Sequence, residues 1–349
     1  MRRRLLFTGL AVLLALLAFE GLFRVLETRV RGLLGPFEID EVPEPLGFDP
    51  FHEVGHLDRN DVMNAAGYRG PERPTERAPG SFRVAVLGDS FTFGWGVAAE
   101  DAWPALLEAR LAAHAPGARV EVLNFGVPGY NTWLQLLHWR RVVSRSQPDA
   151  VLLGYYSNDA AIDRRVPNVY RLCPLPAPRS ARTFAAAQEH SALVRAIHDL
   201  AWFVRQGSPV PPWGSDMVLR EDHYGFACSM HWLAELDADV RATGAGFSVV
   251  QLPHMEGLGQ EPDEEIAAQE RLVAALRSRG IATSHLYPRM AGADGRAVNN
   301  ADAHPNVLGN QLILEALWPE GGQWLLAQAL VRGAEAPKQS DPDPSDPGR

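Results

Sequence analysis

The chain has 349 residues, of which 46% are hydrophobic, and a formal net charge of -9. This composition predicts a globular protein with a packed core and argues against wholesale disorder. It also argues against a nucleic-acid-binding surface, because phosphate contacts need clustered Lys and Arg, and the sequence contains no long basic block.

The first 26 residues differ in composition from the rest. Arginines at positions 2–4 precede residues 5–19, which carry no charge, and Glu20 is the next charged residue. A helix of this length matches a hydrocarbon core of ~30 Å, and no small-x-small cleavage site follows it. We therefore expect residues 1–26 to form an uncleaved single-pass membrane anchor, with the rest of the chain extracytoplasmic; secretion after cleavage of a signal peptide is the alternative.

Residues 27–80 are rich in Pro, Gly and charge, which predicts a linker and leader of irregular structure. After this leader, short apolar runs alternate with helix-like segments, a pattern typical of a parallel sheet covered by helices. The strands are expected at 82–87, 120–124, 150–155, 247–252 and 281–286, and the main helices at 102–113, 133–144, 231–243 and 263–277. The pattern predicts a three-layer α/β/α domain over residues 81–333, with a five-stranded, mainly parallel sheet.

Two regions break the alternation. Residues 160–221 contain several prolines and no fitting strand, so we expect an insertion at the catalytic edge, either a lid or substrate wall or a structural excursion packed on the sheet. Residues 334–349 are polar and Pro-rich, which predicts a disordered tail. Cys173 and Cys228 are too far apart for a CxxC motif; an oxidising compartment would permit them to pair, and the sequence leaves open whether they do.

Ligands of open α/β sheets bind beyond the carboxyl ends of the strands, and four short blocks carry reactive residue types at such positions. The blocks are Gly88-Asp89-Ser90-Phe91, Asn124-Phe125-Gly126-Val127-Pro128-Gly129, Ser157-Asn158-Asp159 and Asp302-Ala303-His304-Pro305-Asn306. The residues around Ser90 do not form a G-x-S-x-G nucleophile elbow, which argues against an α/β-hydrolase. In their order and content the blocks instead resemble those of the SGNH (GDSL-like) hydrolase family.

The resemblance implies a flavodoxin-like fold and a role for each block. Ser90 would be the nucleophile, and a neutral hydroxyl needs a base, which His304 would supply. Asp302 would orient the imidazole ring. The oxyanion would be held by the amides of Ser90 and Gly129 and by the side chain of Asn158.

This chain departs from the family pattern at two places. Tyr156 stands where the third block usually has Gly, two residues before the Asn, and Asp302 lies two residues before His304 instead of three. The orienting partner of His304 therefore stays open between Asp302, a backbone carbonyl and Asp294.

We expect no cofactor and no metal. His254, His285 and His304 all lie near predicted strand ends, but their spacing is not a recognised zinc motif, and a serine-centred site needs no metal.

The sequence therefore predicts a serine esterase that forms an acyl-serine intermediate, acting on a small-molecule, glycan or lipid ester, with a membrane tether favouring a substrate at the cell envelope. An O-acyltransferase acting on a polysaccharide is one alternative, and a non-catalytic glycan-binding domain is another. Residues 64–72 resemble the leader of membrane-anchored bacterial members of the family, but they offer no chemistry by themselves. The oligomeric state is not predicted.

Overall fold

The computed structural model describes the predicted domain and parts of the segments around it. The described residues are 14–26, 29, 63–64, 66–74, 77, 80–160, 173–176, 191–194, 197, 219, 224–300 and 304–335. Most of the predicted insertion, nearly all of the predicted tail and Asp302 lie outside these residues.

The domain is built on five parallel strands in the order β2-β1-β3-β4-β5, which confirms the predicted sheet. Every strand except the short edge strand β5 is almost entirely buried, as expected of a sheet covered on both faces. The strands span Ser81–Gly88 (β1), Arg119–Gly126 (β2), Ala150–Tyr155 (β3), Gly246–Gln251 (β4) and Ala282–His285 (β5).

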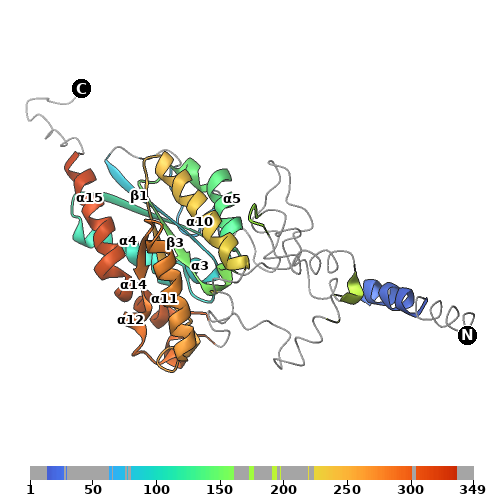
Figure 1. Ribbon diagram of the computed structural model, residues 1–349. Helices are drawn as coiled ribbons and strands as arrows, with labels where there is room; N and C mark the ends of the chain where they lie inside the picture. Colours follow the sequence, from blue (N-terminus) through green and yellow to red (C-terminus); the bar gives the residue numbers. More distant parts are fainter. Residues whose placement is uncertain are drawn as a thin grey trace, which may run out of the picture.

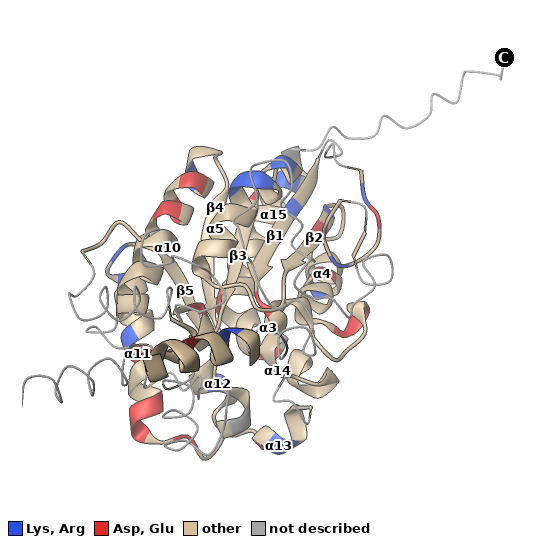
Figure 2. Ribbon diagram, turned by 90° about the vertical axis from the view of Figure 1, so that its right-hand side faces the viewer, with Lys and Arg blue, Asp and Glu red and all other residues tan. Residues whose placement is uncertain are grey.

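Helices cover the two faces of the sheet as two outer layers (Figure 1). One face carries α5 (Thr132–Arg141), α10 (Tyr224–Ala242) and α11 (Asp263–Arg277). The other carries α4 (Trp103–His114), α14 (Val307–Leu317) and α15 (Gln323–Glu335). Shorter elements are α3 (Ser90–Phe93), α12 (Tyr287–Met290), α13 (Gly295–Val298), the 3-10 turns Ala99–Asp101, Val143–Ser146, Ser157–Ala160 and Met255–Gly257, and the π-turn Trp318–Gly322. In Figure 2 acidic and basic residues are interspersed over the outer helices.

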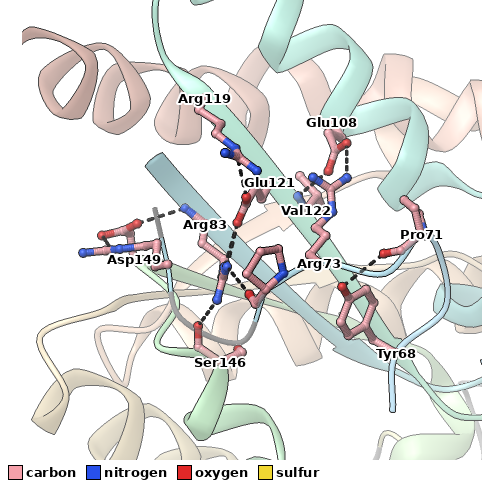
Figure 3. A network of polar contacts seen from close by, with 12 residues as sticks. Tyr68, Pro71, Arg73, Arg83, Glu108, Arg119, Glu121, Val122, Ser146 and Asp149 are labelled. Carbon is pink, nitrogen blue, oxygen red and sulfur yellow. Dashed lines mark hydrogen bonds and ion pairs between the residues drawn. The ribbon is translucent and has the colours of Figure 1, made fainter. Parts of the chain in front are cut away.

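Part of the leader packs against the domain through polar contacts, one of them to a fully buried charge pair of the sheet (Figure 3). Arg83 at the start of β1 bonds Glu121 of β2 at 2.8 Å, and both side chains are 1% exposed. The Arg83 guanidinium also donates to the carbonyl oxygens of Pro74 and Ser146. Arg73 of the leader pairs with Glu108 of α4 at 2.6 Å. The buried Arg83–Glu121 pair compensates both charges, and the leader contacts hold residues 73–74 against α4 and the start of β1.

Residues 14–26 are helical, and their apolar side chains are mostly exposed. Glu20 accepts hydrogen bonds from Ser191 Oγ at 2.7 Å and from the amides of Ala192 and Leu193 at 3.0 Å, so this helix contacts the predicted insertion. Within the described residues, no helix reaches the length and apolarity that crossing a bilayer would require. The predicted anchor, residues 1–26, also includes residues 1–13, which lie outside the described part of the chain.

Cys173 and Cys228 form a disulfide, which answers the question that the sequence left open. Cys228 lies in α10, and the Tyr224 hydroxyl of the same helix donates to the Leu175 carbonyl oxygen at 3.0 Å. The predicted insertion is therefore fastened covalently to the helical layer.

Removing this disulfide is expected to destabilise the protein. The bond closes a loop of 55 residues, and a cross-link over a loop of that order typically contributes about 2–4 kcal/mol by restricting the unfolded chain. The Cys173→Ala, Cys228→Ala double variant should show a loss of that size in urea unfolding. Wild-type protein unfolded with and without reductant is the control, and equal midpoints in the two would contradict the prediction.

His138 of α5 makes stability sensitive to acid. The ring is fully buried between Phe125 and Tyr130, and burial lowers its pKa from 6.5 to about 4. Below pH 6.5 the unfolded chain therefore binds a proton that the folded chain takes up only near pH 4. The free energy of unfolding falls as the pH drops from 6.5 to 4, by about 3 kcal/mol in total. His138→Leu should remove this part of the pH dependence in unfolding measurements, and the same pH dependence in His138→Leu and wild-type protein would contradict the prediction.

Candidate active site

Ser90 lies at the carboxyl end of β1, an interior strand of the sheet. It is the first residue of α3, and Asp89 before it is the N-cap, whose side chain accepts from the Phe91 amide at 2.9 Å. Since Asp89 provides the cap, the Ser90 hydroxyl is free for another role. The helix ends after one turn at Gly94, which has a φ of 83°.

Three glycines, which we call the glycine row, allow α3 to lie close against the sheet. Gly88 of β1 is in register with Gly126 of β2 and Gly154 of β3. A methyl group added at Gly88 or Gly154 would lie 2.1 or 2.2 Å from Thr92 Oγ1, and one at Gly126 would lie 2.4 Å from the Phe93 nitrogen. The backbone and side chains of α3 thus occupy the space where side chains of these strands would stand.

His304 comes from the loop before α14. The His304 carbonyl oxygen accepts from the Asn300 amide at 2.8 Å. Asn306 caps α14 by accepting from the Gly309 amide, and its own amide group donates to the carbonyl oxygens of Ala297 and Asn299. These bonds fix the loop against the turn formed by α13.

Ser90 and His304, 214 residues apart in the chain, meet at this edge of the sheet. His304 Nε2 lies 2.8 Å from Ser90 Oγ, which is hydrogen-bonding distance. Proton transfer between a hydroxyl and an imidazole needs this separation. Ser90 is 8% exposed and His304 is half-buried, so the hydroxyl is the more shielded of the two groups.

The other predicted site residues follow the two strands beside β1. Gly129 lies beyond β2 with a φ of 82°, a backbone conformation that favours glycine. Asn158 lies beyond β3, and its Nδ2 donates to Asp89 Oδ2 at 3.0 Å. Gly129 and Asn158 thus follow the two strands that flank β1, and Asn158 is bonded to the residue before Ser90.

Two buried carboxyl groups lie beneath this turn. Asp89 holds Asn158 and the Phe91 amide, while Asp159 accepts from Gln135 Nε2 at 2.7 Å and from the Tyr156 amide at 2.9 Å. Burial raises the pKa of Asp89, and burial together with the nearby Asp89 charge raises that of Asp159. Both are joined to the loop after β3, so they stabilise its conformation.

Aromatic rings form one wall of the site. The Phe91 ring stacks on Tyr156 with centroids 4.1 Å apart and lies 5.2 Å from the His304 ring, and Trp95 lies 6.2 Å from His304 on another side. His254, beyond β4, is parallel to Tyr156 at 6.3 Å. Tyr156, the departure noted in the sequence, therefore packs into this wall.

The remaining acidic residues near the site differ in their positions. Asp302 lies outside the described residues. Asp294, the alternative partner of His304, is the N-cap of α13 and accepts from the Arg296 amide. In the described part of the chain, no group of three or more His, Cys, Asp or Glu side chains could hold a metal. The sequence analysis gave no role to Asp89 or Asp159; their position beside Ser90 and Asn158 was the available signal.

Comparison with known proteins gives a family match. Residues 86–312 match the model of the GDSL-like Lipase/Acylhydrolase family. A 79-residue segment is 34% identical to an arylesterase from Vibrio mimicus, and the match spans 23% of this chain and 38% of the arylesterase.

Two solved structures align with much of the chain. The structure of TesA aligns with a TM-score of 0.42 and 20% identity, covering 71% of this chain and 99% of TesA. Axe2, an acetylxylan esterase from Geobacillus stearothermophilus, aligns with a TM-score of 0.45 and 15% identity, covering 69% of this chain and 94% of Axe2.

Proposed function

Because the chain belongs to the GDSL-like lipase/acylhydrolase family, we propose that it is a serine esterase that cleaves ester-linked acyl groups through an acyl-Ser90 intermediate. The observation that carries the proposal is the 2.8 Å contact between His304 Nε2 and Ser90 Oγ. A serine hydroxyl becomes an effective nucleophile when a base lies within hydrogen-bonding distance.

The first half of the reaction forms the acyl-enzyme. Ser90 Oγ attacks the ester carbonyl carbon while His304 Nε2 takes the hydroxyl proton. The resulting oxyanion accepts hydrogen bonds from the amides of Ser90 and Gly129 and from Asn158 Nδ2. Collapse of the tetrahedral intermediate breaks the ester bond, and the protonated His304 gives its proton to the leaving alkoxide. In the second half water attacks the acyl-Ser90 carbonyl with His304 again as the base, which releases the acid and restores the serine.

Asp302 is proposed to orient the His304 ring. The alternative role for Asp294 has less support, because that carboxylate is exposed and caps α13. A negative partner for the ring would stabilise the imidazolium that forms when Ser90 loses its proton. Activity retained in Asp302→Asn but lost in His304→Ala would favour a dyad oriented by a backbone carbonyl.

The proposed substrate is an acylated glycan or lipid of the cell envelope. Support comes from the uncharged run at residues 5–19 and the exposed apolar helix at 14–26, which suit a single-pass anchor with the catalytic domain outside the cytoplasm, in the periplasm of a bacterial envelope. The disulfide fits an oxidising compartment of this kind. An anchored enzyme would meet envelope esters at high local concentration.

Fluorophosphonate labelling followed by peptide mapping tests the proposal without a known substrate. We expect the label on Ser90 in wild-type protein and no label on His304→Ala. Absence of both labelling and p-nitrophenyl acetate turnover would contradict the esterase proposal and favour the alternative, a non-catalytic glycan-binding domain. Adding a sugar acceptor separates the other two activities, because an O-acyltransferase would form the acylated sugar in preference to free acid.

A further inference from the structure

Arg69 connects the leader to the turn that carries the nucleophile. Its Nη1 donates to the carbonyl oxygens of Phe93 at 2.7 Å and Gly94 at 2.8 Å, and its Nη2 donates to the Val97 carbonyl oxygen at 2.7 Å. The guanidinium also lies 4.4 Å from the centroid of the Phe93 ring. These carbonyls belong to the end of α3 and the following loop, residues 93–97, which we call the nucleophile loop.

This set of contacts requires an arginine side chain. A guanidinium is a planar fork with several donors in fixed directions, so it can hold three carbonyl oxygens and pack on an aromatic ring together. A cation at the end of a helix also satisfies carbonyls that have no partner inside the helix. The Arg69 backbone is itself fixed, because its amide donates to the Asn124 carbonyl oxygen of β2 at 2.9 Å.

The nucleophile loop touches both halves of the reacting pair. At its start, the amides of Gly94 and Trp95 donate to the Ser90 carbonyl oxygen at 3.1 and 3.0 Å. The Trp95 ring lies 6.2 Å from His304. A methyl group added at Gly96 would lie 2.6 Å from Asn300 Nδ2, and the Asn300 amide holds the His304 carbonyl oxygen. A shift of this loop would therefore move the nucleophile and the base relative to each other.

We propose that Arg69 is a positioning residue, which fixes the nucleophile loop so that Ser90 and His304 stay in hydrogen-bonding contact and Trp95 stays against the base. This rests on the proposed function, since the reacting pair is the one assigned above. It assigns a role to the leader stretch at residues 64–72, in which the sequence showed no chemistry. Displacement of the leader would loosen the site without removing any catalytic group.

The test compares Arg69 with Arg73, a second leader arginine that pairs with Glu108 of α4 at 2.6 Å. Arg69→Ala should lower kcat for p-nitrophenyl acetate by about 10- to 100-fold, since a misplacement of about 1 Å can cost 10²-fold, with little change in KM. Fluorophosphonate labelling of Ser90 should slow in parallel. Arg69→Lys, which keeps the charge but not the fork, should lie between Arg69→Ala and wild type.

Arg73→Ala is the matched control and should keep kcat within about twofold of wild type at a temperature where both variants are folded, because it removes a leader contact outside the nucleophile loop. Hydrogen exchange should accelerate at the amides of residues 94–97 in Arg69→Ala and Arg69→Lys but not in Arg73→Ala. Equal kcat losses in Arg69→Ala and Arg73→Ala, or unchanged exchange at residues 94–97, would overturn the positioning role. Wild-type protein that neither turns over ester nor labels would instead overturn the proposed function.

Discussion

Ser90→Ala is expected to lower kcat for p-nitrophenyl acetate by about 10⁴-fold or more, and His304→Ala to have a comparable effect. The two side chains act as a unit, because the hydroxyl is a weak nucleophile without the imidazole 2.8 Å away. The double variant should therefore be no slower than either single variant. Steady-state kinetics on the purified variants, with active-site titration of wild-type protein, measures all three rates.

Two surface substitutions serve as controls for these variants. Ser278→Ala, at the end of α11, and His114→Gln, at the end of α4, change the same residue types at exposed positions and should leave kcat unchanged. A Ser90→Ala protein that retains a tenth of wild-type activity would show that another group attacks the ester.

Asn158→Ala is expected to lower kcat by about 10²- to 10³-fold with a small change in KM, because an oxyanion donor acts mainly in the transition state. Affinity for a phosphonate that mimics the tetrahedral intermediate should fall by a similar factor. The substitution also removes the donor to Asp89 Oδ2, so thermal unfolding must show that the variant is folded at the assay temperature. A rise in KM at constant kcat would place Asn158 in substrate binding instead.

The sheet could be predicted well because its signal is local. The predicted strand 150–155 matches β3, and the other predicted strands overlap the observed ones, since buried parallel strands are short continuous apolar runs. Helix α10 begins at Tyr224, seven residues before the predicted start at 231, and α15 was not predicted. The start of α10 and the whole of α15 lie next to segments in which the spacing of apolar residues does not show where tertiary packing begins.

The candidate site was only partly accessible from sequence. Ser90 and His304 lie in recognisable blocks, and the structure brings them together. Arg69 gave no signal, because it lies in an irregular stretch and its partners are backbone carbonyl oxygens 24 to 28 residues further along the chain. Contacts to carbonyls depend on the path of the backbone and not on the identity of the partner residue, so no residue pattern records them.

The glycine row limits how the substrate range of this enzyme could be changed. A methyl group added at any of these three glycines would lie 2.1 to 2.4 Å from an atom of α3, so these strand positions leave no room for a larger side chain. Mutagenesis aimed at larger or smaller acyl groups must therefore be directed at positions outside the sheet, such as His254, which meets the aromatic wall through Tyr156.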